Sequence, residues 1–126
     1  MVEHTLFRWL SVVETTRTSY LAEMSVKGYT YILKCADHSY YTGSTKYLEP
    51  RLKQHQEGNG AIYTRNRLPV QLVYFEEHSR IDLAFAREKQ IQGWSRKKKE
   101  ALIDGMPEKL RELAKCMNDT AFDFEK

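Results

Sequence analysis

Residues 29–42, YTYILKCADHSYYT, decide how the middle of this chain folds. The first half of this stretch is rich in β-branched and aromatic residues, residues 37–39 supply turn chemistry, and strand character then resumes. The stretch therefore predicts a β-hairpin. A three-residue loop would pair Cys35 with Tyr41. Because side chains alternate between the two faces of a sheet, Tyr31 and Tyr41 are then expected on the same face.

Outward from the hairpin, the pattern predicts a further strand and several helices. Pro50 suits the first turn of a helix that Gly58 ends. The sequence favours strands at 29–35, 40–42 and 70–75, helices at 47–57, 80–92, 96–104 and 107–116, and a polar, basic loop at 63–67. This order predicts a small α+β domain in which helices flank a three-stranded, mostly antiparallel sheet.

The length of 126 residues indicates one folded domain. We place it at residues 26–105, between an N-terminal extension, 1–25, and a C-terminal helix and tail, 106–126. The two cysteines belong to no CxxC motif, which argues against a disulfide framework and a zinc site and favours the cytoplasm. No apolar run approaches the roughly 18 residues that a membrane span requires, so no membrane association is expected.

The positive charge is concentrated in the middle of the chain. The net charge is +3, and residues 28–105 carry 13 basic and 9 acidic side chains, a net charge of +4. Residues 1–27 sum to zero and residues 106–126 to −1. This distribution favours an anionic partner for the middle segment, although such a charge is also common on ordinary protein surfaces.

Glu88 is unusual because it falls within the apolar stripe of the predicted helix 80–92. At about 100° per residue, Ile81 lies about 20° from it, Ala84 about 40°, and Phe85 and Ile91 about 60°. A carboxylate in a core-facing stripe needs a cation, a hydrogen-bond donor or a metal ion beside it. A structural salt bridge with a buried arginine and a functional site explain this pattern equally well.

Arg51 and His55 form a second candidate pair on the predicted helix 47–57. Their i, i+4 spacing brings the two side chains together, and both can face a cleft beside the sheet. The plainer alternative is a solvated arginine and a histidine at the edge of the core. A tyrosine hydroxyl is a poor base alone, but a neighbouring arginine or metal-bound water makes proton transfer feasible.

The loop 63–67, YTRNR, combines an aromatic residue with two arginines. This composition suits phosphate oxygens and base faces. The alternative is that Arg65 and Arg67 are solvated or pair with Glu76 or Glu77 on the following strand.

Four segments together resemble the GIY-YIG endonuclease superfamily, and in particular its small single-domain bacterial members. They are residues 29–31 (YTY), 40–44 (YYTGS), 48–55 (LEPRLKQH) and 86–89 (AREK). The resemblance covers about residues 27–105. Tyr29 replaces the usual glycine of the first motif, and Thr42 replaces the isoleucine of the second.

The resemblance implies a metal-dependent endonuclease that hydrolyses DNA, including branched or damaged DNA in repair or recombination, with Mg²⁺ or Mn²⁺ as cofactor. Glu88 would bind the metal, Arg51 would stabilise the phosphate, and Tyr41, aided by Tyr31 or His55, would accept a proton from water. The residues expected to bind nucleic acid are Ser44, Lys53, Tyr63, Thr64, Arg65 and Arg67. Two alternatives remain open: a nucleic-acid-binding module of the same fold with little cleavage activity, and a domain for an unrelated ligand.

Overall fold

The computed structural model describes residues 26–123, so the expected extension 1–25 and the end of the expected tail lie outside the described residues. The elements are β1 (Gly28–Lys34), β2 (Tyr40–Thr45), α2 (Leu48–Gln56), α3 (Ile62–Arg65), β3 (Gln71–His78), α4 (Ile81–Gln92), α5 (Arg96–Asp104) and α6 (Glu108–Asp123). None of the helices within residues 26–123 has the length and apolar character needed to cross a membrane.

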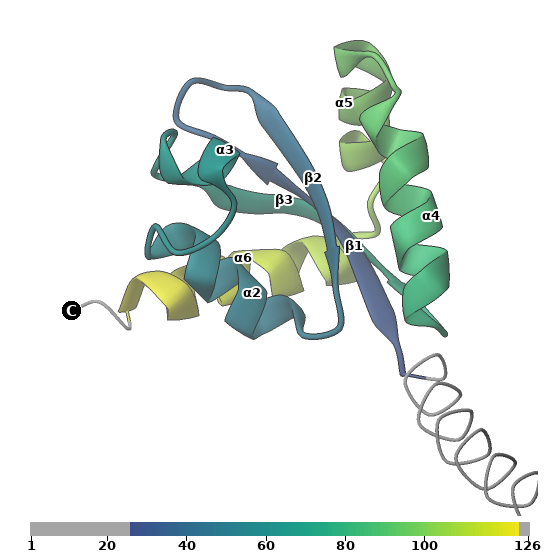
Figure 1. The fold of residues 1–126 in the computed structure, drawn as a ribbon, viewed down its shortest axis with the longest axis horizontal. Coiled ribbons are helices and arrows are strands. Elements are labelled where there is room, and N and C mark those ends of the chain that lie inside the picture. The colour runs from purple at the N-terminus through teal and green to yellow at the C-terminus, as the bar shows by residue number, and fades with distance from the viewer. Residues whose placement is uncertain (1–25, 124–126) are drawn as a thin grey trace, which may run out of the picture.

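The three strands form one antiparallel sheet in the order β2-β1-β3. Helices α2, α3 and α6 lie on one side of this sheet, and α4 and α5 lie on the other (Figure 1). The prediction of an α+β fold with a three-stranded antiparallel sheet flanked by helices is confirmed. Alternate residues of β1 serve the two layers: the Thr30 hydroxyl donates to the Ala84 carbonyl of α4 at 2.9 Å, whereas Tyr31 contacts α2.

The predicted hairpin register was wrong by two residues, because the loop is longer than three residues. Leu33, not Cys35, pairs with Tyr41. The Cys35 carbonyl accepts the amide of His38 at 2.9 Å, and His38 adopts a left-handed conformation with φ of 67°. The Asp37 carboxylate accepts the Ser39 amide at 3.1 Å, which closes the turn. A shift of two residues preserves the alternation, so Tyr31 and Tyr41 still share a face.

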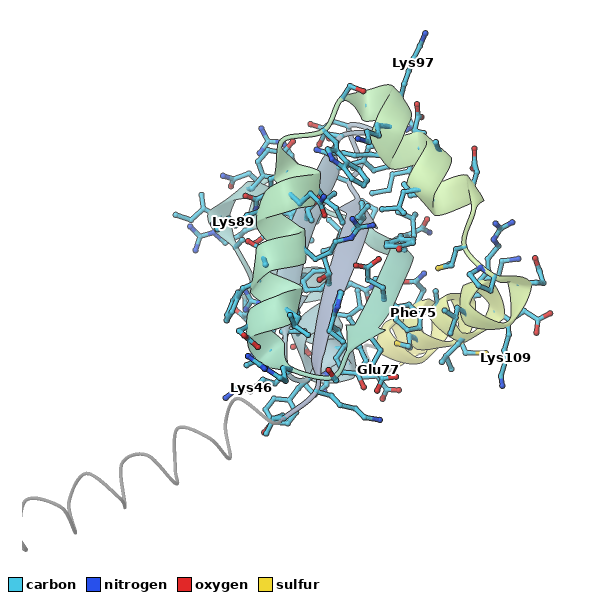
Figure 2. All side chains as sticks on the ribbon, turned by 90° about the vertical axis from the view of Figure 1, so that its right-hand side faces the viewer. Lys46, Phe75, Glu77, Lys89, Lys97 and Lys109 are labelled. Atoms are coloured by element: carbon cyan, nitrogen blue, oxygen red, sulfur yellow. The ribbon has the colours of Figure 1, made fainter. Side chains whose placement is uncertain are left out.

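Two other segments differ from the sequence prediction. The expected loop 63–67 overlaps the short helix α3, and the last helix extends to Asp123 instead of ending near residue 116. The added length matters for the core, since Ala114 and Met117 of α6 are buried against the sheet. In Figure 2, the side chain of Lys97 at the start of α5 extends away from the rest of the domain, as expected for a solvated charge.

The two edge strands of the sheet, β3 and β2, have different neighbours. Helix α6 covers β3, and the Asn118 side chain bonds both the amide and the carbonyl of Leu72, at 2.9 and 3.0 Å. This pairing satisfies backbone groups that an edge strand would otherwise expose. Strand β2 forms the opposite edge, and the Thr42 carbonyl there accepts the Gln92 amide at 3.3 Å.

Candidate active site

Tyr31, His55 and Thr64 form a buried hydrogen-bonded chain between the sheet, α2 and α3. The Tyr31 hydroxyl lies 2.9 Å from His55 Nε2, and Thr64 Oγ1 lies 2.8 Å from His55 Nδ1. His55 and Thr64 are fully buried, and Tyr31 is 2% exposed. Burial, followed by the positive charge of Arg51, lowers the pKa of His55 from 6.5 to about 4. His55 is therefore neutral at pH 7, and one of its ring nitrogens carries no proton and accepts a hydrogen bond.

The low pKa of His55 predicts a specific dependence of protein stability on pH. Between pH 6.5 and about pH 4 the unfolded chain binds a proton at His55 and the folded chain does not. The free energy of unfolding should fall by about 3 kcal/mol as the pH drops through this window and then stop changing on this account. Urea unfolding at pH 7 and pH 4.5 should show a smaller loss for His55→Gln than for wild type.

A matched control for this prediction is the exposed His38, replaced by asparagine, which tolerates the left-handed backbone there. His38→Asn should lose as much stability as wild type between the two pH values. If His55→Gln also does so, burial of His55 in its neutral form is not the cause.

Tyr41 and Arg51 lie next to this chain. The Tyr41 ring centroid is 6.4 Å from that of Tyr31 and 5.3 Å from that of His55. Burial raises the pKa of Tyr31 to about 12 and also raises the pKa of Tyr41, while the Arg51 guanidinium opposes both shifts. Arg51 Nη1 also donates to Gln54 Oε1 at 3.0 Å. The i, i+4 pair on α2 thus faces both tyrosines, and His55 lies inside the core.

Glu88 of α4 occupies the other side of β2. Its side chain is 14% exposed, and it accepts the Ser44 hydroxyl at 2.6 Å and the Gln92 amide at 3.1 Å. The predicted need for a cation or hydrogen-bond donor beside this carboxylate is met by these two neutral donors and by the exposed Lys89, whose Nζ lies 3.8 Å from Glu88 Oε2, not by a buried arginine. The apolar stripe was partly wrong, because Phe85 is 51% exposed.

The two groups of residues meet at the edge strand β2. Tyr41 and Ser44 project to opposite faces of that strand, toward α2 and α4. The charges of both Glu88 and Arg51 nevertheless act on the Tyr41 hydroxyl, in opposite directions on its pKa. Gly43, between Tyr41 and Ser44, leaves room for the Tyr31 ring: a Cβ there would lie 2.5 Å from the Tyr31 hydroxyl oxygen.

Gly43→Ala should therefore destabilise the protein and displace the Tyr31 hydroxyl. The added methyl overlaps a buried ring that has little room to move, which typically costs about 1–3 kcal/mol. Gly93→Ala is the matched control, because φ is −81° there and the nearest atom to the new Cβ is 3.5 Å away. Urea unfolding should show a clear loss for Gly43→Ala and none for Gly93→Ala; equal stabilities would contradict the close contact at Gly43.

The oxygen atoms around Glu88 fit a hard divalent cation. Mg²⁺ commonly uses one or two carboxylates and fills its other positions with water and phosphate oxygens. Within residues 26–123, no three histidine, cysteine, aspartate or glutamate side chains cluster in a way that could hold a metal, so Glu88 would hold such an ion as a lone carboxylate. The buried Thr42 hydroxyl, on the strand that carries Ser44, has no hydrogen-bond partner within the described part of the chain.

The residues expected to bind nucleic acid fall into different settings. Ser44 is used by Glu88, and Lys53 lies partly buried on α2 two positions after Arg51. Thr64 is fully buried, so the expected contact of this side chain with nucleic acid does not fit the structure. Arg65 is exposed at the end of α3.

Arg67 and Tyr63 are held by other parts of the protein. Arg67 donates to Asp37 at 3.1 Å and to the Tyr63 carbonyl at 3.0 Å, and its guanidinium lies 3.8 Å from the centre of the Tyr63 ring. The alternative pairing of the loop arginines with Glu76 or Glu77 is not observed, because Glu76 pairs with Arg87 and Glu77 with Lys27.

Gln92 and two glycines were missed by the sequence reasoning. Gln92 connects Glu88 to the Thr42 carbonyl, and its i+4 spacing from Glu88 was the signal available for finding it. Gly43 and Gly60 create space for Tyr31 and His55, since a Cβ at Gly60 would overlap His55 Nδ1. Nothing local in the sequence marks these two close approaches.

Comparisons with known proteins identify the family of the chain. A sequence model of the GIY-YIG catalytic domain matches residues 27–101, more than half of the chain, and the chain belongs to this family. Similar proteins include a UPF0213 protein of Haloquadratum walsbyi, 46% identical over 76 residues, which are 60% of this chain and 85% of that protein. A UPF0213 protein of Clostridium perfringens is 47% identical over 90 residues, 71% of this chain and 97% of that protein.

A solution structure of a UPF0213 protein of Bacillus halodurans is also similar. The two sequences are 41% identical, and the match covers 62% of this chain and 83% of the Bacillus halodurans chain with a TM-score of 0.42.

Proposed function

We propose that this protein is a metal-dependent endonuclease that hydrolyses DNA phosphodiester bonds at the edge of β2. The observation that carries the proposal is the meeting of two kinds of groups at this edge. One kind is a proton-transfer pair, Tyr31 and His55, together with the cation Arg51, all on one face of the sheet. A solvent-accessible carboxylate, Glu88, lies on the other. A domain that only binds nucleic acid has no chemical need for this combination.

Tyr31 is the residue best placed to accept a proton from the attacking water. The sequence interpretation gave that role to Tyr41, with Tyr31 or His55 assisting. Only Tyr31, however, is hydrogen-bonded to a neutral histidine, at 2.9 Å. Its high pKa disfavours a free tyrosinate. A relay in which Tyr31 passes its own proton to His55 Nε2 as it takes one from water avoids that species.

Arg51 and Tyr41 would hold the phosphate group. A guanidinium presents a planar fork that matches phosphate oxygens, and its contact strengthens as negative charge develops on the phosphate. Glu88, supported by Ser44 and Gln92, would hold Mg²⁺ or Mn²⁺. When bound, such an ion supplies charge stabilisation to the departing oxygen.

The direct test is incubation with duplex, nicked, branched and single-stranded DNA, with and without Mg²⁺. Cleavage that EDTA abolishes supports the proposal, and a preference for branched or nicked DNA would place the enzyme in repair or recombination. Binding to these DNAs without any cleavage, in Mg²⁺ and in Mn²⁺, would instead make the protein a binding module.

Arg65 should contribute to DNA binding and not to the chemical step. Its side chain is exposed on α3, so it can contact a phosphate outside the reacting group. Arg65→Ala should weaken duplex binding and reduce the slope of log K against log salt by about 0.9, the value for one lost phosphate contact. Turnover at saturating DNA should change little.

The matched variant is Arg67→Ala, in which the lost guanidinium is already bonded to Asp37 and Tyr63. Arg67→Ala should leave the salt slope unchanged. Binding titrations over a salt series decide the matter, and an unchanged slope for Arg65→Ala would remove this side chain from the interface.

A further inference from the structure

We propose that α3 and its flanking residues, 60–67, form a positioning element in which Thr64 orients His55 toward Tyr31 and Tyr63 orients Tyr41. The positioning of individual side chains is independent of catalysis, but its consequence for turnover rests on the proposed nuclease function. Neighbouring residues of one short helix would then set the geometry of both tyrosines.

Thr64 determines which nitrogen of His55 carries the proton. Its hydroxyl lies 3.0 Å from the Ala61 carbonyl and 2.8 Å from His55 Nδ1. A carbonyl can only accept, so the threonine proton belongs to that contact, and His55 Nδ1 must donate to Thr64 Oγ1. His55 Nε2 is then unprotonated and accepts the Tyr31 hydroxyl.

The opposite assignment leaves a contact without a hydrogen. If Thr64 donated to His55 Nδ1, its 3.0 Å contact with the Ala61 carbonyl would join two oxygens with no proton between them. The Tyr31 hydroxyl would accept from His55 Nε2 and lose its own acceptor. In the first assignment, all three contacts carry a hydrogen, so it is the one that satisfies these buried groups.

The backbone of the same segment fixes the position of His55. Gly60 packs so closely against the imidazole that any side chain there would overlap Nδ1. Thr64 and His55 are both fully buried, so neither has a surface to offer a ligand. Thr64 therefore orients His55 inside the core, and it affects the reacting groups only through His55.

Tyr63 orients Tyr41 by ring stacking. The two rings stack with centroids 6.0 Å apart and planes inclined by 26°. The Arg67 guanidinium covers the Tyr63 ring at 3.8 Å and is itself anchored by Asp37 of the β1–β2 loop at 3.1 Å. A ring held in this way has little freedom, and it limits the freedom of the tyrosine stacked on it.

The decisive measurement is the tautomer of His55, obtained from the nitrogen NMR signals of the imidazole in the whole protein at pH 7. Wild type should carry its proton on Nδ1. Thr64→Val, which keeps the shape of threonine but removes the hydroxyl, should shift the population toward the Nε2-protonated form, and Thr64→Ser should restore the Nδ1 form. A wild-type ring protonated on Nε2, or a Thr64→Val ring that stays protonated on Nδ1, would overturn the role of Thr64.

For Tyr63 the readout is the set of ring resonances of Tyr41. Tyr63→Leu should move these resonances and speed the rotation of the ring, while Tyr63→Phe should leave both as in wild type. If Tyr63→Leu leaves the Tyr41 ring unchanged, Tyr63 does not position it.

Kinetics then connect positioning to turnover. Thr64→Val and Tyr63→Leu should each lower kcat up to about 100-fold, the typical cost of a small misplacement of a reacting group, with KM unchanged. Thr64→Ser and Tyr63→Phe should restore kcat, and a rise in KM that accompanies the fall in kcat would count against the proposal. If wild type cuts no DNA, the nuclease proposal fails, and the NMR results still decide whether residues 60–67 position the two tyrosines.

Discussion

Glu88→Gln should reduce DNA cleavage by more than about 10³-fold while leaving DNA affinity nearly unchanged. The amide keeps the size of the carboxylate and can still accept the Ser44 hydroxyl, but it lacks the negative charge that holds a divalent cation. A bound cation supplies several kcal/mol of charge stabilisation in the transition state, which corresponds to this loss of rate. Cleavage assays in Mg²⁺ and calorimetric titration with Mn²⁺ should both register the change.

Glu112→Gln is the matched control, since it makes the same substitution at an exposed position of α6 on the β3 side of the sheet. It should cleave DNA and bind Mn²⁺ as wild type does. A Glu88→Gln protein that cuts DNA at the wild-type rate would show that Glu88 is not the metal ligand.

Arg51→Ala should lower the rate of cleavage by about 10²- to 10³-fold, the usual loss for one donor that contacts the reacting group. The affinity for DNA should fall far less, because the contact strengthens only as negative charge develops in the transition state. Arg51→Lys keeps the charge but not the planar fork, so it should recover part of the rate. Single-turnover kinetics and equilibrium binding separate the two effects.

The same variants have a signature that does not depend on cleavage. The Arg51 charge helps to lower the pKa of His55, after burial, so NMR titration of His55 should show a higher pKa in Arg51→Ala than in wild type or Arg51→Lys. If binding and turnover fall equally in Arg51→Ala, the residue is a phosphate anchor and not a transition-state contact.

The parts of the site that the sequence predicts are those set by regular periodicity. Strand alternation placed Tyr31 and Tyr41 on one face, and helical spacing placed Glu88 toward the sheet beside Ile81 and Ala84, both of which are buried. Alternation survived an error in the hairpin register because the error was an even number of residues. The length of the loop was predicted wrongly because His38 adopts a left-handed conformation that the local sequence does not predict.

Contacts between distant segments escaped prediction for a different reason. Thr64 looks like a polar loop residue, and only the folded chain shows its hydroxyl buried against His55. Gly60 and Gly58 look alike in sequence, but only Gly60 packs against the imidazole. Nothing local in the sequence reveals the contact of Arg67 with Asp37, which lies 30 positions earlier. Such pairings depend on tertiary geometry, which no short window of sequence contains.

The two sides of the site are supported by different helices, and this makes them separable units. His55 and Arg51 depend on α2, whereas Glu88 and Gln92 depend on α4 across the sheet. A change that loosens α4 can disturb the contacts of Glu88 while the Tyr31–His55 pair stays intact, and a change in α2 can do the reverse. If the proposed cleavage needs both sides, either change alone would remove it and leave a folded protein with the other half of the site preserved.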